Sequence, residues 1–228
     1  MKTVLITGIS RGIGKALAQR FLTADFRVIG TSTTGRVDST HANLQVIRLD
    51  LSDPKSIEHS AKTLTDLGIK IDIFINNAGI LEDDGETKVI INKLRKTLEV
   101  NLIGTIDLTE RIIPLIAENG HILNMSSMAS SLNDTVATAN LHYPYNYPAY
   151  KISKCALNMY TRTLAMRLAH EDSRHIIVSA VHPGWVKTDM GGDEAPISPA
   201  DAAEHIFQLA ISKPETGQFW FRNKKWMW

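Results

Sequence analysis

The fold of this chain is decided by the stretch Thr3-Val4-Leu5-Ile6-Thr7-Gly8-Ile9-Ser10-Arg11-Gly12-Ile13-Gly14. Its first half has the composition of a buried strand, and apolar residues at helical spacing follow it. Glycines between a strand and a helix permit a tight turn and let the backbone come close to a ligand. The N-terminus of the following helix presents free N–H groups and a positive dipole end, which suit a phosphate. The spacing G-x-x-x-G-x-G therefore predicts a nucleotide site, although it differs from the G-x-G-x-x-G of the general dinucleotide fingerprint.

Strands and helices alternate along the rest of the chain. We expect strands over residues 4–7, 26–31, 44–49, 71–75, 122–125, 176–181 and 217–221. Helices are expected from 13, over 54–67 and 89–116, in the segment that carries Tyr150 and ends near 169, and from 199. This order predicts a parallel sheet with helices on both faces. The expected architecture is a single α/β domain over residues 1–228, a doubly wound Rossmann fold with a mostly parallel, seven-stranded sheet.

Composition limits the kinds of partner. With 228 residues, of which 43% are hydrophobic and 21% charged, the chain can bury the core of one domain. A formal net charge of +1 offers no general attraction to nucleic acid or to an anionic membrane, and no apolar run reaches membrane-spanning length. We therefore expect a small-molecule ligand and a cytoplasmic protein. Cys155 is the only cysteine, which excludes an internal disulfide and fits a reducing compartment.

Tyr150 and Lys154 are the main candidates for proton chemistry. Residues four apart share one helical face, so the ammonium of Lys154 is expected beside the phenol of Tyr150. A nearby positive charge favours the phenolate, and we expect it to lower the pKa of Tyr150 from near 10 by up to about three units. Tyr147 and Lys151 have the same spacing. Because Pro148 suits the first helical position, we expect Tyr147 at or before the cap and Tyr150 inside the first turns.

The end of the second expected strand indicates the kind of nucleotide. An acidic residue at this point binds the ribose 2′-hydroxyl in dinucleotide folds, but residues 31–34 are neutral here. Arg36 comes shortly afterwards, and Arg11 lies inside the glycine turn. Two guanidinium groups suit a 2′-phosphate, which favours NADP(H) over NAD(H). The alternative is that Arg36 is simply a solvated loop charge.

Polar residues follow other expected strands, at the sheet edge where ligands bind in open α/β folds. The carboxylate of Asp50 could accept from an adenine amino group, or it could cap the next helix, a role for which Asp53 is better placed. Ser127 lies just past the fifth expected strand. Asn101 lies amid apolar neighbours in a long expected helix, where its side chain could bend the helix, hold a water or face solvent.

In chain order, these motifs are similar to those of the short-chain dehydrogenase/reductase family over nearly the whole chain. The motifs are Thr7-Gly8-x-x-x-Gly12-x-Gly14, Asn76-Asn77-Ala78-Gly79, Asn101, Ser127, Tyr150-x-x-x-Lys154 and Pro183-Gly184. The segment HPGWVKTDM at 182–190 and the Trp-containing tail resemble the carbonyl-reductase branch that includes the C-factor-like proteins. Each motif is weak alone, and their order is what makes the resemblance specific.

The resemblance implies an NAD(P)-dependent oxidoreductase, above all an NADPH-dependent reductase of a small ketone or aldehyde, or the enzyme of the reverse alcohol oxidation. In the family's catalytic set, Tyr150 would handle the proton of the carbonyl oxygen, and Lys154 would tune Tyr150 and hold the nicotinamide ribose. Ser127 would hydrogen-bond the substrate oxygen, and Asn101 would position a water that relays protons. The implied cofactor contacts are Gly8, Ser10, Arg11, Gly12, Ile13, Gly14, Arg36, Asp50, Leu51, Asn77, Ala78, Gly79, Tyr150, Lys154, Pro183, Gly184, Val186 and Thr188. No residue is assigned to a metal.

Two departures from the family pattern concern the substrate side. The connection between Ser127 and Tyr150 is longer than usual, so residues 133–147 are expected to loop out over the substrate site. The tyrosines of this insert could line a pocket for a flat or apolar substrate, or pack the loop. The chain over 188–198 leaves little room for the usual lid helix.

Alternatives of other classes stay open at this point. The fold could serve a cofactor-binding regulatory or signalling protein without turnover, or an epimerase or dehydratase. The helix that carries Tyr150 has an apolar stripe formed by Ile152, Ala156, Tyr160, Leu164 and Leu168. Such a stripe could pair subunits in a homodimer or homotetramer, or belong to the core.

Overall fold

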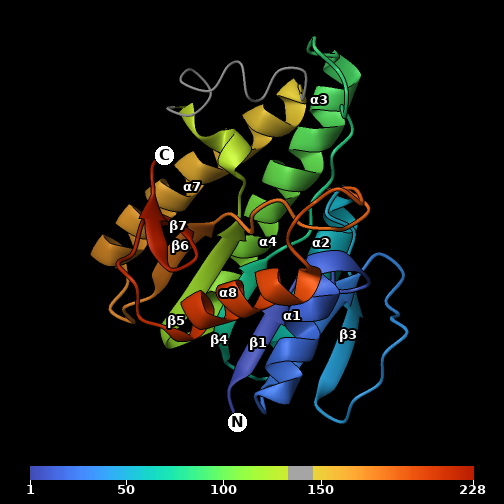
Figure 1. The fold of residues 1–228 in the computed structure, drawn as a ribbon. Coiled ribbons are helices and arrows are strands. Elements are labelled where there is room, and N and C mark those ends of the chain that lie inside the picture. The colour runs from blue at the N-terminus through green and yellow to red at the C-terminus, as the bar shows by residue number, and fades with distance from the viewer. Residues whose placement is uncertain (133–145) are drawn as a thin grey trace.

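One eight-stranded sheet runs through the computed structural model, which describes residues 1–132 and 146–228 (Figure 1). The strands are β1 (Thr3–Ile6), β2 (Arg27–Ser32), β3 (Leu44–Arg48), β4 (Ile71–Asn76), β5 (Ile116–Met125), β6 (Ile177–Val181), β7 (Gln218–Phe221) and β8 (Lys224–Trp226). They lie in the order β3-β2-β1-β4-β5-β6-β7-β8, and every neighbouring pair is parallel except β7 and β8. The expected α/β fold with a mostly parallel sheet is confirmed.

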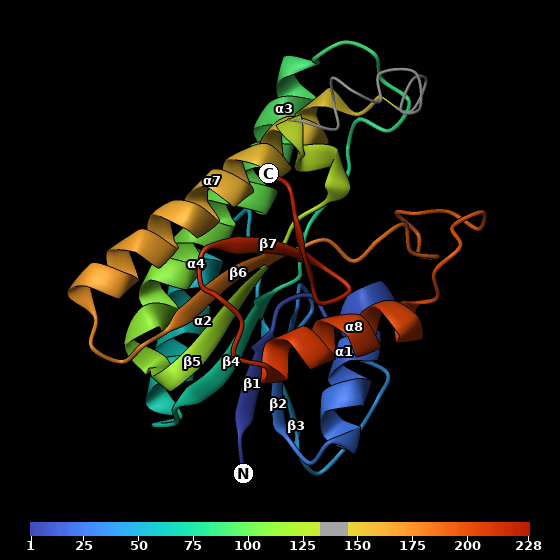
Figure 2. The same ribbon diagram turned by 60° about the vertical axis from the view of Figure 1, so that its left-hand side comes forward.

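Helices cover both faces of this sheet (Figures 1 and 2). The α-helices are α1 (Gly12–Thr23), α2 (Pro54–Asp66), α3 (Ile91–Leu98), α4 (Thr105–Ile112), α7 (Pro148–Glu171) and α8 (Pro199–Ile211). α1 and α8 pack together on one face, and α2, α4 and α7 cover the other. Within the described residues, none of these helices is both long and apolar enough to cross a membrane.

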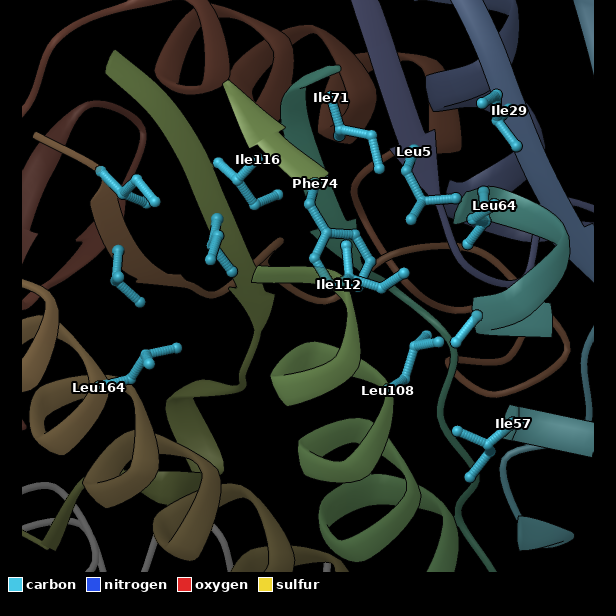
Figure 3. Packing of buried hydrophobic residues seen from close by; sticks show 14 of the residues in the cluster. Leu5, Ile29, Ile57, Leu64, Ile71, Phe74, Leu108, Ile112, Ile116 and Leu164 are labelled. Carbon is cyan, nitrogen blue, oxygen red and sulfur yellow. The ribbon is translucent and has the colours of Figure 1, made fainter. Parts of the chain in front are cut away.

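Alternation along the strands gives each face its own core. In β1, Leu5 belongs to the cluster under α2, α4 and α7, while Val4 and Ile6 belong to the cluster under α1 and α8. Successive side chains of a strand point to opposite faces, so a strand that is covered on both sides is apolar at most positions. Figure 3 shows Leu5, Phe74 and Leu108 among the nearly fully buried side chains of the first cluster.

Two helix starts agree with their sequence signals. Asp53 caps α2 by accepting a hydrogen bond from the backbone N–H of Lys55 at 3.0 Å. Ser198 caps α8 by accepting from the N–H of Asp201 at 3.1 Å. Such a side chain satisfies an N–H that has no partner within the helix. Asp53 is therefore the cap of α2, and Asp50 is left for another role.

The direction in which the chain adds strands to the sheet reverses between β1 and β4. The chain adds β2 and β3 on one side of β1 and then crosses to β4 on the other side. Ligands bind at such a switch point, outside the carboxyl ends of the strands. Residues 8–14 follow β1 and residues 77–79 follow β4, so both glycine-containing segments lie at this point.

The long helical stretch expected over 89–116 is confirmed as an uninterrupted run over 91–115, but it is not α-helical throughout. The structure has α3, then a π-helix over Glu99–Gly104, then α4 and a 3-10 turn over Ile113–Leu115. β5 already begins at Ile116, which is earlier than expected. Pro114 lies in the 3-10 turn and cannot continue α-helical hydrogen bonding. The change was not evident from periodicity, because short apolar runs suit buried helices and strands alike.

The sheet has one more strand than the seven expected. Arg222 and Asn223 have φ of 47° and 60° and form a two-residue connection between β7 and β8. Positive φ at both positions matches the twist of an antiparallel hairpin. Arg-Asn lacks the glycine that usually indicates such a connection, so the sequence predicted only a turn after β7.

Candidate active site

The glycine turn after β1 holds a backbone geometry that larger residues would obstruct. Gly8 and Gly12 have φ of 72° and 55°, a region that favours glycine. A Cβ at Gly14 would lie 2.0 Å from the carbonyl oxygen of Gly8. Ser10 is exposed and Ile13 partly exposed in the same turn. α1 starts here without a cap from any side chain of the described residues, so its first N–H groups are available to a phosphate.

Hydrogen bonds of Thr7 and Asn77 join the glycine turn to the segment after β4. Asn77 Nδ2 donates to the carbonyl oxygens of Thr7 and Gly8 at 2.8 and 3.1 Å. Thr7 Oγ1 accepts from the N–H groups of Asn77 and Ala78 at 3.0 and 2.9 Å. Thr31 Oγ1 accepts from the N–H of Gly8 at 3.3 Å. The two segments at the switch point therefore form one continuous wall.

The residues expected at the adenosine half lie at the ends of β2 and β3. Arg36 is exposed, and its backbone N–H and carbonyl are both bonded by the hydroxyl of Ser32. Asp50 accepts from the hydroxyl and the N–H of Ser52 at 2.6 and 2.9 Å. These two hydrogen bonds hold the pKa of Asp50 below its usual range. Leu51 is buried beside it, and an adenine contact of Asp50 stays a prediction.

Arg11 joins the glycine turn to the loop after β6. Its Nη1 lies 2.7 Å from Oδ2 of Asp189, and both side chains are largely exposed. Beside this pair, a Cβ at Gly12 would lie 3.2 Å from the side chain of Thr188. Two distant parts of the chain that were expected to contact the cofactor thus meet here.

The loop after β6 turns sharply and contains no lid helix. Pro183 precedes Gly184, which has φ of 88°. Val186 is buried and pairs with Ile197 in an isolated bridge. Apart from the bridge residue Ile197, residues 188–198 form turns, bends and irregular backbone, with no helix. The substrate side is therefore not covered by a helix from this loop.

Tyr150, Ser127 and Lys154 converge at the carboxyl end of β5. The side chain of Ser127 lies near the hydroxyl of Tyr150 and acts to lower the pKa of that hydroxyl. Lys154 lies one turn further along α7, and its Nζ is 5.6 Å from the centroid of the Tyr150 ring. The same Nζ donates to the carbonyl oxygen of Met125 at 2.8 Å. A phenol, a hydroxyl and an ammonium thus share one corner, which we call the proton corner.

Asn101, in the π-helix, lies on the side of the proton corner that faces Gly79. Its Oδ1 accepts from the N–H of Ile80 at 2.8 Å, and its Nδ2 donates to the carbonyl oxygen of Ile80 at 2.9 Å and to Ser153 Oγ at 3.1 Å. A Cβ at Gly79 would lie 3.2 Å from Asn101 Oδ1 and 3.5 Å from Lys154 Nζ. Gly79 therefore keeps the space between them open. The alternative of a solvent-facing Asn101 is wrong, because the residue is 1% exposed.

Burial sets the protonation of Tyr150 and Lys154. It raises the pKa of Tyr150 to about 12, against a smaller downward effect of the Ser127 hydrogen bond. It lowers the pKa of Lys154 to about 8. The expected lowering of the Tyr150 pKa is therefore wrong, because desolvation of the phenolate outweighs the ammonium, which is bonded to a backbone carbonyl. At neutral pH, Tyr150 is a phenol and most of Lys154 is charged.

Tyr147 lies outside α7, as Pro148 predicted. Pro148 is the first residue of α7, and Tyr147 occupies the N-cap position. The ring of Tyr147 packs edge-on against that of Tyr150, with centroids 5.9 Å apart. The Nζ of Lys151 is 5.3 Å from the Tyr147 centroid. The rest of the expected insert, 133–145, lies outside the described residues, so its loop over the substrate site stays a prediction.

Two polar side chains beside the proton corner were not predicted from the sequence. Asn158 Nδ2 donates to Ser130 Oγ at 2.7 Å, and Ser130 Oγ donates to the carbonyl oxygen of Ser127 at 2.5 Å. Asp83 is 1% exposed and accepts from the N–H of Ala149 at 2.6 Å. Asn158 lies one helical turn after the lysine of the corner, a spacing that could have indicated it. Asp83 lies in an acidic stretch, and no local pattern distinguishes it from its neighbours.

A sequence model of the short chain dehydrogenase family matches residues 2–196. This span contains the glycine turn, the proton corner and the loop after β6. The chain belongs to the short-chain dehydrogenase family.

Relatives of this short-chain dehydrogenase include carbonyl reductases and 3-oxoacyl-acyl-carrier-protein reductases. It is 28% identical over 265 residues to the NADPH carbonyl reductase 1 of Mus musculus, with 94% of each chain covered. It is 32% identical over 200 residues to the 3-oxoacyl-acyl-carrier-protein reductase FabG of Aquifex aeolicus, with 83% of this chain and 75% of the relative covered.

Solved structures of carbonyl reductases are also similar to this chain. The NADPH-bound carbonyl reductase from chicken fatty liver has a TM-score of 0.89 and 27% identity, with 100% of this chain and 94% of that chain covered. The carbonyl reductase Sniffer of D. melanogaster has a TM-score of 0.85 and 25% identity, with 100% of both chains covered. The short-chain dehydrogenase described here thus falls in the carbonyl-reductase branch and is an NAD(P)-dependent oxidoreductase acting on carbonyl or CH–OH groups.

Proposed function

We propose that this short-chain dehydrogenase reduces a small ketone or aldehyde with NADPH, or catalyses the reverse alcohol oxidation. The observation that carries the proposal is that Tyr150 lies beside both Ser127 and the buried amine of Lys154. A binding module has no need for a phenol and a hydroxyl paired next to an ammonium. Relatives named for carbonyl reduction with NADPH support the same reaction.

The residues at the switch point fit a dinucleotide. A Cβ at Gly14 would lie 2.0 Å from a backbone carbonyl oxygen of its own turn, and one at Gly79 would enter the space beside Lys154. The glycine turn would hold the pyrophosphate, Lys154 the nicotinamide ribose, and Thr188 the carboxamide or the pyrophosphate. When bound, NADP(H) would supply or accept the hydride at the nicotinamide C4.

In the reductive direction, the protein's task is to deliver a proton to the carbonyl oxygen. Tyr150, with a pKa of about 12, holds its proton at neutral pH and can act as the general acid. Ser127 would hydrogen-bond the same oxygen while negative charge develops on it. The charged Lys154 would stabilise the phenolate that is left after transfer. Asn101 would position a water that returns a proton to this pair.

Tyr150→Phe tests the proposal, and Tyr147→Phe is its matched control. A positioned general acid contributes typically about 10²–10⁴-fold, so NADPH oxidation with a carbonyl should fall by that factor in Tyr150→Phe. NADPH binding, measured by fluorescence titration, should stay at the wild-type level. Tyr147→Phe should keep its turnover. A fully active Tyr150→Phe would remove Tyr150 from its role.

A carbonyl screen separates this function from its rivals. Purified wild type with NADPH should oxidise the cofactor in the presence of at least one ketone or aldehyde of the panel. Binding of NADPH without oxidation on any carbonyl would favour a regulatory or signalling protein without turnover. Conversion of a substrate with no net redox change would favour an epimerase or dehydratase.

The proposed preference for NADP(H) over NAD(H) rests on Arg11 and Arg36, which are both exposed, and on the absence of an acidic residue over 31–34. A hydrogen bond to a charged group contributes about 1.5–3 kcal/mol, so Arg36→Ala should weaken NADPH binding about tenfold or more and leave NADH binding unchanged. Arg222→Ala, in the turn at the other end of the sheet, is the control. NADH that binds wild type as tightly as NADPH would contradict this preference.

Self-association into a homodimer or homotetramer is the proposed quaternary state, through the exposed face of α7. Ile152 and Met159 are 42% and 67% exposed there, whereas Leu164 and Leu168 of the expected stripe are buried in the core. Only part of that stripe is therefore available to a second subunit. Light scattering should give a multiple of the chain mass for wild type and a monomer for Met159→Glu. A monomeric wild type would contradict the proposed state.

A further inference from the structure

Asp83 lies in the segment after β4 and reaches the start of α7. Its side chain is buried, with 1% of the residue exposed. Oδ2 accepts from the backbone N–H of Ala149 at 2.6 Å, and Oδ1 accepts from that of Tyr150 at 3.4 Å. A residue far away in sequence thus caps the helix that carries the proposed proton donor.

The first turn of α7 depends on this distant cap. Tyr147, in the N-cap position, makes no side-chain cap hydrogen bond, and Pro148 has no N–H. The N–H of Lys151 is already bonded to the carbonyl oxygen of Tyr147 at 3.0 Å. The two remaining N–H groups of this turn are those from which the carboxylate of Asp83 accepts.

The segment that carries Asp83 is itself fixed to neighbouring elements. Asn101 bonds both backbone groups of Ile80 at 2.8 and 2.9 Å. Glu82 pairs with Lys96 of α3 at 2.9 Å. A carboxylate that accepts from N–H groups at a helix N-terminus also complements the helix dipole. Asp83 therefore connects the wall at the switch point to the backbone of the proton donor.

We infer that Asp83 is a positioning residue for the proposed reduction, on which this inference rests. Its carboxylate holds the backbone of Tyr150 and thereby fixes the phenol against Ser127, so that proton transfer starts from one geometry. Asp83 acts through the backbone and not through the reacting atoms. Misplacement of a reacting group by about 1 Å can cost about 10²-fold in rate.

Asp83→Ala and Asp83→Asn test the inference. We expect kcat to fall about 10²-fold in Asp83→Ala and about tenfold in Asp83→Asn, which keeps one acceptor oxygen. The KM values for NADPH and for the carbonyl should stay unchanged in both variants. All assays are run below the unfolding transition of every variant, because loss of a cap also lowers stability.

Two control variants separate positioning from stability and charge. Ser198→Ala removes the cap of α8, which carries none of the proposed catalytic residues, and should keep kcat. Asp84→Asn removes an exposed neighbouring charge and should also keep it. A kcat for Asp83→Ala equal to that of Ser198→Ala would overturn the inference, and so would a loss confined to KM.

Hydrogen exchange gives a second readout that does not depend on turnover. The amide protons of Ala149 and Tyr150 should exchange about tenfold or more faster in Asp83→Asn, while the rest of α7 keeps its protection. Unchanged exchange at both amides would show that Asp83 does not hold this turn. A wild type that oxidises no NADPH with any carbonyl would refute the proposed function instead, and the exchange rates would still decide whether Asp83 anchors Tyr150.

Discussion

Burial disfavours the charged form of both titratable groups in the proton corner. It raises the pKa of Tyr150 to about 12 and lowers that of Lys154 to about 8. The phenol therefore keeps the proton that a reductase must donate, while the amine is mostly an ammonium at neutral pH. Of the two, only Lys154 changes charge within a few pH units of neutrality.

Reduction should weaken at alkaline pH because of Lys154. As the pH rises through about 8, the amine loses its proton and the phenolate loses its stabilising charge, so kcat should fall along a titration centred near pH 8. Lys154→Arg keeps its charge over this range and should lack the alkaline limb, whatever rate it retains. The check is kcat for NADPH oxidation from about pH 6 to about pH 10. A wild-type profile that stays level over that range would contradict this role of Lys154.

His121 makes the stability of the protein sensitive to acid. In the core, its Nδ1 lies 3.2 Å from the carbonyl oxygen of Ala210 and its Nε2 lies 2.9 Å from Ser179 Oγ. Because a carbonyl oxygen only accepts, Nδ1 donates to Ala210. In the neutral ring that burial favours, Nε2 then accepts from the hydroxyl of Ser179. Burial lowers the pKa of His121 from 6.5 to about 4. The unfolded chain thus takes up a proton before the folded protein does.

The neutral His121 should contribute about 3 kcal/mol to the free energy of unfolding above pH 6.5. This contribution should be lost as the pH falls toward 4. His121→Gln should be less stable at neutral pH but should lack this part of the acid dependence. Exposed His170→Gln should keep the wild-type dependence. Urea unfolding at a series of pH values measures all three proteins. Equal pH dependence of wild type and His121→Gln would contradict the assignment.

For single residues, the sequence predicts those features that depend on neighbouring residues in the chain. Pro148 predicts a helix start that places Tyr150 inside the helix and Tyr147 before it, and the structure confirms that start. The direction of the Tyr150 pKa shift was missed, because it depends on burial that no short pattern reports. Asp83 was missed as well, since its partner Ala149 lies 66 positions away in the chain.

Among the elements, the π-helix over Glu99–Gly104 carries Asn101, whose side chain lies beside the proton corner. π-helical turns arise within α-helices and are frequent at functional sites. Its last residue, Gly104, packs on the segment after β3, where a Cβ would lie 1.9 Å from the carbonyl oxygen of Leu51. The sequence predicted a bend at Asn101 as one option, but not the type of helix, because apolar spacing hardly changes over a single widened turn.

Gly104→Ala should destabilise the protein by about 1–3 kcal/mol, the usual cost of overpacking. The added methyl group would collide with the backbone of Leu51 and push the π-helix outward. Gly68→Ala is the control, because Gly68 has nothing within 4 Å of the added carbon, and its positive φ should cost about 1 kcal/mol. Urea unfolding of both variants gives the comparison. A smaller loss for Gly104→Ala than for Gly68→Ala would contradict this packing argument.

At the scale of the whole molecule, the end of the chain returns to the loop that carries Ser127. The ring of Trp228 stacks on Phe219 with centroids 5.5 Å apart, and the guanidinium carbon of Arg162 lies 5.5 Å from the Trp228 ring. A main-chain oxygen of Trp228 accepts from Ser131 Oγ at 3.3 Å. The last residue thereby connects β7, α7 and the loop after β5.

Trp228→Ala should lower the free energy of unfolding by about 1–3 kcal/mol, which is less than the cost of removing a fully buried tryptophan. Met227 is 63% exposed, so Met227→Ala should change stability by no more than about 0.5 kcal/mol. Urea unfolding measures both. Indistinguishable variants would show that the stacking on Phe219 does not hold the tail in solution.

The overall architecture was predictable because its determinants are local and repeated. Apolar runs separated by helical periods predicted the parallel sheet, and the glycine turn predicted the place of the ligand. The early start of β5 at Ile116 and the existence of β8 were not predicted, because both depend on pairing with strands that lie elsewhere in the chain. Sheet partners of this kind do not appear in any short stretch of sequence.

The sheet ends at β3 on one side and at β8 on the other. β8 has three residues, and two of them, Lys224 and Lys225, are exposed. Short edge strands that carry lysine are poor templates for a strand of another molecule. The β7–β8 hairpin, which leads to the C-terminus, therefore also disfavours strand pairing between molecules at this edge of the sheet when the protein is concentrated.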